Sequence, residues 1–68
     1  MQKIGKIKVY DNWNGMILSE NKEYKFRKDD LIFEDVVVGD EVTFVPEEFV
    51  KTKILTARFI KKKELSKW

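Results

Sequence analysis

The stretch Gly5-Lys6-Ile7-Lys8-Val9-Tyr10 decides the fold, because small or apolar residues alternate in it with basic or aromatic ones. A period of two predicts a half-buried β-strand, and one face of that strand would carry Ile7 and Val9. The other face would carry Lys6, Lys8 and Tyr10. The chain is therefore expected to begin as a sheet protein.

Short strands and polar turns continue through the first part of the chain. Residues 11–15 are rich in Asn, Asp and Gly, which favours a turn, and residues 16–19 are apolar enough for a second strand. Residues 20–22 are polar and predict another turn, after which residues 23–27 alternate again. Three antiparallel strands joined by short turns are expected, which is a meander.

The pattern then becomes less regular. Residues 28–35 break the alternation, and Asp29 or Asp30 would cap a single helical turn there that carries Leu31 and Phe33. Residues 42–45 predict a fourth strand. We expect Pro46 to end it, because proline has no N–H to donate to a ladder.

Residues 53–60 are β-branched and aromatic enough to predict a fifth strand. Five short strands would leave wide exposed edges in an open sheet, so closure into a barrel is favoured. A meander, a break and two further strands predict an all-β, small five-stranded antiparallel OB-type barrel over residues 1–61, with a basic tail over residues 62–68. An SH3-like barrel is the structural alternative. The expected core aromatics are Tyr24, Phe26, Phe44 and Phe59, while Phe33 and Phe49 are expected to plug the barrel ends.

Size and composition exclude several classes of protein. The 68 residues suffice for one domain with a small core. The chain has no cysteine, which fits a reducing compartment, and its apolar runs are far shorter than the roughly twenty residues of a membrane span. We therefore expect a cytoplasmic protein. Without histidine, cysteine or a motif that would activate Ser19 or Ser66, we expect neither an enzyme nor a cofactor, and the acidic stretch lacks the ligand spacing of a calcium loop.

The charges fall into three blocks. Residues 1–28 carry seven bases against three acids, residues 29–48 carry eight acids and no base, and residues 49–68 carry seven bases against one acid. The formal net charge is only +2, but if the two ends of the chain fold side by side, one side of the protein is strongly basic. Such a side attracts polyanions.

The chain resembles the cold-shock domain family, whose first strand reads glycine-lysine-valine-lysine-tryptophan-phenylalanine. Residues 5–10 are similar to that strand, and residues 15–17 to the end of the family's first RNA-binding motif. Residues 23–31 resemble the second motif in polarity, residues 39–44 the glycine-x-x-valine-x-phenylalanine strand, and residues 57–59 the closing segment. S1-like barrels of the small initiation-factor type are a second resemblance. Either family implies an OB-type barrel that binds nucleic acid.

The departures from the cold-shock pattern concern the aromatic platform on which bases stack. The resemblance places Val9, Met16, Lys25, Arg27 and Lys28 at the platform positions. Cations thus replace most of the aromatics, and Tyr10 and Trp13 are the aromatic candidates that remain on that side. The resemblance implies binding that depends more on phosphates than on bases, and that weakens steeply with salt.

The sequence thus predicts binding of single-stranded RNA or DNA across the first three strands. The expected contacts are phosphate contacts from Lys8, Lys25 and Arg27, base stacking on Tyr10 and Trp13, and an apolar contact from Met16, with Lys6 and Arg58 as second choices. No acid is expected to share these outward positions, and the acidic block is expected to lie off the binding face. One alternative is that Trp13 folds over a barrel end. The functional alternative is a protein-interaction or regulatory barrel that has lost nucleic-acid binding.

Overall fold

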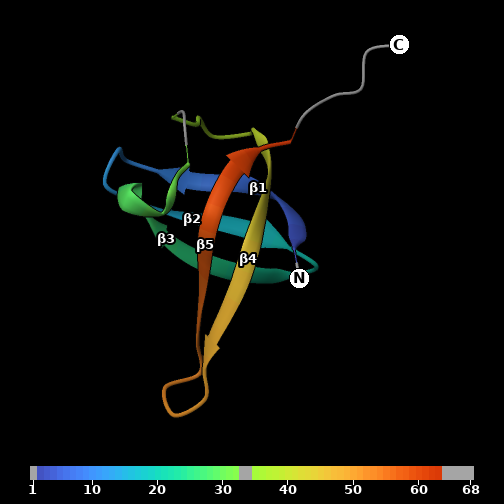
Figure 1. The fold of residues 1–68 in the computed structure, drawn as a ribbon, viewed down its shortest axis with the longest axis vertical. Helices are drawn as coiled ribbons and strands as arrows, with labels where there is room; N and C mark the ends of the chain where they lie inside the picture. Colours follow the sequence, from blue (N-terminus) through green and yellow to red (C-terminus); the bar gives the residue numbers. More distant parts are fainter. Residues whose placement is uncertain (1, 33–34, 64–68) are drawn as a thin grey trace.

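The computed structural model describes residues 2–32 and 35–63 and contains five β-strands and one short 3-10 helix (Figure 1). The elements are β1 (Lys3–Tyr10), β2 (Asn14–Ser19), β3 (Lys22–Arg27), η1 (Lys28–Asp30), β4 (Glu41–Phe49) and β5 (Ile54–Lys62). No helix within the described ranges is long and apolar enough to cross a membrane.

The strands close into a barrel in the order β1-β2-β3-β5-β4. β1 pairs antiparallel with both β2 and β4, and β5 pairs antiparallel with β4. The barrel closes through a short parallel contact between β3 and β5, where Lys25 is opposite Thr56. The expected five-stranded barrel of OB type is confirmed, with the difference that the β3–β5 seam is parallel where an antiparallel barrel was expected.

The core consists of the inward residues of all five strands together with one valine of the loop before β4. Its buried members are Ile7, Ile17, Tyr24, Phe26, Val36, Val42, Phe44, Ala57 and Ile60. The rings of Tyr24 and Phe44 pack at 5.0 Å between centroids. The predictions for Tyr24, Phe26 and Phe44 are confirmed.

Phe59 was predicted to be a core residue, and this prediction is wrong, because 59% of its surface is exposed. The β4–β5 register shifts at this point, from Thr43 opposite Lys61 to Val45 opposite Arg58. Phe59 lies within that bulge and has a positive φ of 54°. The additional residue in β5 turns the ring outward, and strict alternation cannot anticipate this.

A second bulge changes the first strand. Ile7 is opposite Ile17 but Val9 is opposite Met16, so Lys8 is an additional residue in β1. Beyond it the two faces exchange. Val9 is 44% exposed on the outer face, while Tyr10 points toward the core and packs against Phe26. The expectation that Val9 faces inward and Tyr10 outward is therefore wrong.

Pro46 does not end the fourth strand, as had been expected. β4 continues to Phe49 and pairs with β5 along this whole extension. Its ladder with β1 has already ended at Phe44, so Pro46 lies where β4 has lost one neighbour, and strand edges tolerate proline. The β4–β5 hairpin consequently projects from the barrel (Figure 1).

The hairpin also places Phe49, which was expected to plug a barrel end, away from that end. Phe49 is 50% exposed near the hairpin tip instead of closing a barrel end, and Val50 beside it is 81% exposed. Phe33, the other expected plug, lies outside the described residues. At the opposite end of the hairpin β5 continues to Lys62, so the first residue of the expected tail belongs to the strand.

A single helical turn is present as η1, but it begins earlier than expected: its N-cap is Arg27, Asp29 and Asp30 lie inside the turn, and Leu31 follows it. The Asp30 carboxylate accepts a hydrogen bond from the backbone N–H of Arg27 at 3.0 Å, which satisfies one donor at the start of the turn. Leu31 then forms a parallel bridge with Ile60 of β5. The turn thus carries the chain from β3 to the side of β5, which brings two acidic residues against the outer face of the barrel.

Candidate nucleic-acid interface

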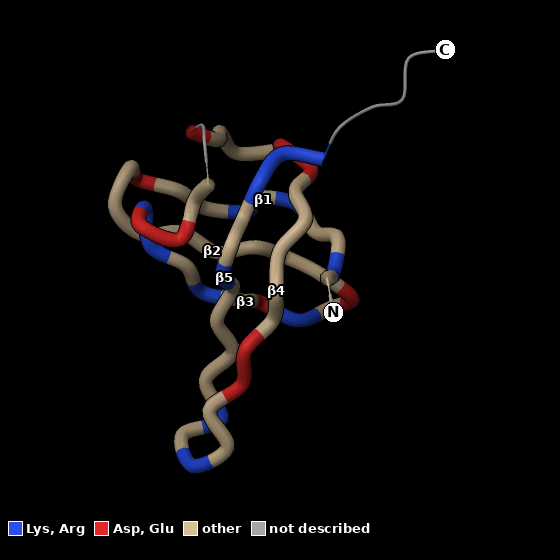
Figure 2. Tube along the Cα trace, in the orientation of Figure 1, with Lys and Arg blue, Asp and Glu red and all other residues tan. Residues whose placement is uncertain are grey.

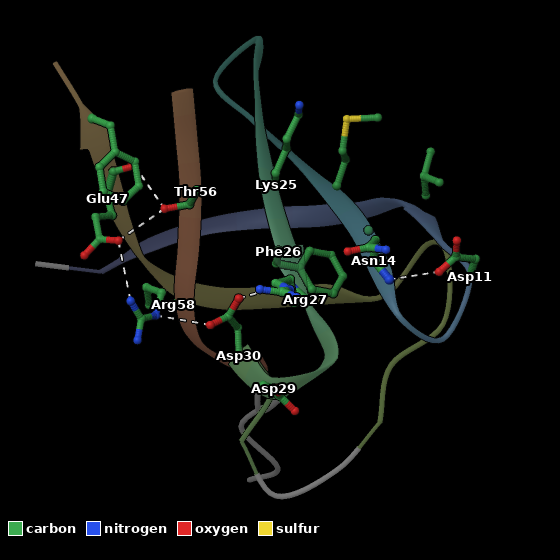
Figure 3. A pocket seen from close by; sticks show the side chains of 14 residues that line it. Asp11, Asn14, Lys25, Phe26, Arg27, Asp29, Asp30, Glu47, Thr56 and Arg58 are labelled. Carbon is green, nitrogen blue, oxygen red and sulfur yellow. Dashed lines mark hydrogen bonds and ion pairs between the residues drawn. The ribbon is translucent and has the colours of Figure 1, made fainter. Parts of the chain in front are cut away.

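A shallow groove of about 820 Å³ crosses the outer face of the barrel (Figure 3). The strand register builds it. Val9 of β1 is opposite Met16 of β2, Met16 is opposite Lys25 of β3, Lys25 is opposite Thr56 of β5, and Thr56 is opposite Glu47 of β4. Side chains opposite one another share a face of the sheet, so these five form one transverse row. All five line the groove.

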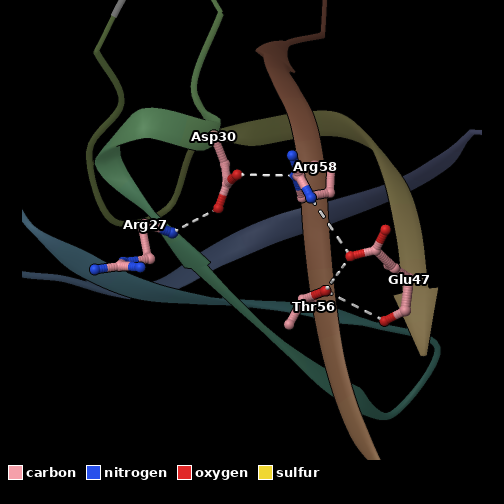
Figure 4. Close-up of polar contacts among 5 residues, drawn as sticks. All are labelled: Arg27, Asp30, Glu47, Thr56 and Arg58. Carbon is pink, nitrogen blue, oxygen red and sulfur yellow. Dashed lines mark hydrogen bonds and ion pairs between the residues drawn. The ribbon is translucent and has the colours of Figure 1, made fainter. Parts of the chain in front are cut away.

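A second row lies next to the first and contains two arginines. Arg27 of β3 is opposite Asn14 of β2, and Arg58 of β5 lies two residues beyond Thr56. Asp30 lies between the arginines. One carboxylate oxygen accepts the Arg27 backbone N–H, and the other lies 3.1 Å from Nε of Arg58 (Figure 4). The acid from η1 thus compensates the charge of Arg58.

Glu47 contacts Arg58 from the other side. Its Oε1 lies 3.6 Å from a terminal nitrogen of Arg58 and accepts a hydrogen bond from the Thr56 hydroxyl at 3.4 Å (Figure 4). Arg58 is therefore held between two carboxylates. The sequence had suggested it as a second-choice phosphate ligand, but in this structure it is already ion-paired.

The cations of β3 have a different environment. Lys25 and Arg27 line the groove with exposed side chains, and neither forms an ion pair with another residue in the described ranges. Lys28 follows at the start of η1 and is also exposed. These three residues form the basic strip of the site, which is visible along β3 and the start of η1 in Figure 2.

The acidic block was expected to lie off this face, and that expectation is wrong. The groove is also lined by Asp11, Asp29, Asp30 and Glu47. η1 folds the first acids of the block back beside β5, and the long β4–β5 hairpin carries Glu47 across the same face. The groove is consequently mixed in charge, with its basic side on β3.

Trp13 is exposed over 73% of its surface, so it does not fold over a barrel end. Its turn is fixed by the Asp11 carboxylate, which accepts backbone N–H bonds from Trp13 at 2.9 Å and Asn14 at 2.8 Å. These hydrogen bonds, the Asn14 one first, lower the pKa of Asp11. The ammonium of Lys28 lies 6.0 Å from the Trp13 ring centroid. Trp13 thus stands beside the end of the basic strip.

Tyr10 does not belong to this surface. Its ring lies 5.5 Å from that of Phe26, and its hydroxyl donates a 2.8 Å hydrogen bond to Asp35. Partial burial, followed by this bond to Asp35, raises the pKa of Tyr10 to about 12. The bulge at Lys8 thus takes away one of the two aromatics that the sequence suggested for stacking bases.

Two lysines of β1 also lie outside the groove. Lys8 forms an ion pair with Glu23 of β3, so an acid does share the outward positions, contrary to expectation. Lys6 is exposed on the outer face opposite Leu18 and Glu41. Of the residues suggested by the sequence, the groove brings together Met16, Lys25, Arg27 and Arg58.

Sequence reasoning missed several lining residues, including Asn14, Glu47, Phe49 and Thr56. Phe49 and Glu47 reach the groove only because the hairpin extends past Pro46. No signal in the sequence pointed to this extension, because proline commonly ends a strand. No cluster of three or more potential metal ligands occurs among the residues that the structure describes. No family model matches the sequence, and no curated protein matches it.

Proposed function

We propose that this protein binds single-stranded nucleic acid along the outer face of β2 and β3. The observation that carries the proposal is the basic strip of Lys25, Arg27 and Lys28, which ends beside the exposed ring of Trp13. Proteins that bind single strands combine a basic path for the phosphates with aromatic rings on which bases stack. In OB-type barrels this ligand commonly lies on strands two and three.

The residues take three different roles in this proposal. Lys25, Arg27 and Lys28 neutralise phosphates. Trp13 stacks a base at one end of the strip, and Met16 offers an apolar contact beside Lys25. The resemblance to cold-shock domains supports the same surface, and the replacement of its aromatics by cations makes phosphate contacts the larger part of the affinity.

The experiment is a titration of a fluorescently labelled single-stranded oligonucleotide with the protein, at low and moderate salt, while Trp emission is recorded. Three phosphate contacts give a slope of log K against log salt of about −2 for a single strand. Absence of binding at low salt would refute the proposal.

A charge-reversed pair of variants locates the site. Lys25→Glu with Arg27→Glu removes two phosphate contacts, each worth about 1.5 kcal/mol, and is expected to weaken binding roughly a hundredfold. Lys6→Glu with Lys61→Glu makes the same change of net charge at exposed positions outside the groove, and is expected to have a much smaller effect. Equal losses in the two double variants would mean that only the overall charge matters.

One observation favours a second candidate function, a protein-interaction module. The projecting hairpin exposes Phe49, Val50 and Ile54 near its tip, and exposed apolar groups that lie together are typical of a contact surface. In that case Val50→Glu would abolish the capture of a specific protein while Lys25→Glu with Arg27→Glu would not, and oligonucleotide binding would be absent.

A further inference from the structure

The two sides of the groove offer different chemistry to a ligand. β3 contributes cations, whereas the β4 edge contributes Glu47, a carboxylate whose side chain is 43% exposed. Lys25 and Glu47 belong to the same transverse row and are separated by β5, where Thr56 lies between them. At a strand spacing of about 4.8 Å their backbones lie roughly 10 Å apart.

A row of this width is wide enough for one nucleotide to lie across it. A phosphate bound to Lys25 would leave the sugar over β5 and the pairing edge of the base toward β4. Phe49, two residues after Glu47 and itself part of the groove lining, offers an apolar surface for the base. Single-stranded bases are commonly recognised by stacking together with hydrogen bonds to this edge.

The carboxylate of Glu47 contacts β5 through one of its two oxygens. Its Oε1 lies 3.4 Å from the Thr56 hydroxyl and 3.6 Å from Arg58, which Asp30 holds from the other side. The other oxygen, Oε2, has no hydrogen-bond or ion-pair partner among the described residues and is free to accept. Arg58 is therefore a positioning residue for Glu47. A carboxylate accepts hydrogen bonds only, so it favours a base edge with an amino group and disfavours one with a carbonyl.

We propose that Glu47 is a specificity-determining residue that accepts a hydrogen bond from the exocyclic amino group of cytosine and thereby discriminates against uracil. This inference rests on the proposed single-strand binding. Glu is a known acceptor for the cytosine amino group, whereas uracil has a carbonyl oxygen at the same place, which repels a carboxylate, and its one donor on that edge is the neighbouring ring N3–H. Sites built around such a hydrogen bond reject analogues that lack the partner group.

The test compares octamers of deoxycytidine and deoxyuridine, which differ only at the base edge in question. Fluorescence anisotropy at low salt is expected to show roughly tenfold tighter binding of the deoxycytidine octamer. Equal affinity, or tighter binding of deoxyuridine, would overturn the inference and leave the proposed function standing. If neither octamer binds, the proposed function itself fails and the inference fails with it.

Glu47→Gln supplies the decisive variant, because an amide both donates and accepts and so serves either base. The ratio of the two affinities is expected to fall close to one, whatever the change in overall affinity. Glu48→Gln is the matched control, since Glu48 is adjacent and exposed but does not line the groove, and it should leave the ratio unchanged. A ratio that changes equally in both variants, or in neither, would contradict the role of Glu47.

Discussion

The outer faces of β3 and β5 meet along one seam, yet their cations are in different states. Lys25 and Arg27 on β3 are unpaired within the described part of the chain, while Arg58 on β5 lies between Asp30 and Glu47. Polar groups of β1 are also paired with acids, as Arg58 is: Lys8 with Glu23, and the Tyr10 hydroxyl with Asp35. The comparison teaches that the nearest acid, rather than the charge of the strand, decides which group remains available to a ligand.

The largest single-residue effect on binding is expected at Trp13, because its ring is exposed and open to a base. Trp13→Ala should weaken oligonucleotide binding by about 1–3 kcal/mol, because stacking of one base on the ring is lost. Trp13→Phe should restore part of the affinity, and unfolding by urea should change little in either variant because the ring is exposed. If both variants bind like the wild type, Trp13 is not a stacking residue.

Two variants, one on β3 and one on β5, contrast the two strands directly, and the larger of their expected effects on binding is of intermediate size. Lys25→Gln is expected to cost about 1.5 kcal/mol of binding free energy, because it loses a charged contact to phosphate. Arg58→Gln should change oligonucleotide affinity much less, since its charge is already compensated, and should lower the stability by about 1 kcal/mol because both ion pairs are partly exposed. Affinity titrations of the two variants under identical salt test this directly. Equal losses would remove the distinction between β3 and β5.

The smallest effect on binding is expected for Tyr10→Phe, which should leave oligonucleotide affinity unchanged and lower the free energy of unfolding below about pH 12, where the wild-type phenol is protonated and bonded to Asp35. The pKa of Tyr10 is about 12 in the folded protein, against an ordinary value of 10.0. The stabilisation from the protonated phenol is therefore complete below pH 10 and is lost as the pH rises through 12. Urea unfolding between pH 9 and 12 should show a shallower decline in the variant, and parallel declines would mean that folding does not raise the pKa of Tyr10.

The meander was predictable because its information is local. The alternation in β3 placed Tyr24 and Phe26 inside and Lys25 and Arg27 outside, as the structure has them. The errors in the predicted faces lie at two bulges, where one additional residue exchanges the faces. At Lys8 the bulge moves Val9 outward and Tyr10 inward, and in β5 it exposes Phe59. No local pattern marks these positions, because a bulge depends on the register of the partner strand.

By itself the sequence determined the class of the protein, a small all-β barrel with β3 as its basic strand, because side-chain periodicity and turn chemistry act within a few residues. Only the tertiary structure decided which charges face one another. η1 folds Asp30 against Arg58, and the part of β4 beyond Pro46 brings Glu47 to the same groove. Part of the acidic block therefore lines a groove that the sequence predicted to be basic. Ion pairs between segments distant in the chain depend on barrel closure and strand register. The periodicity of one segment carries no information on either.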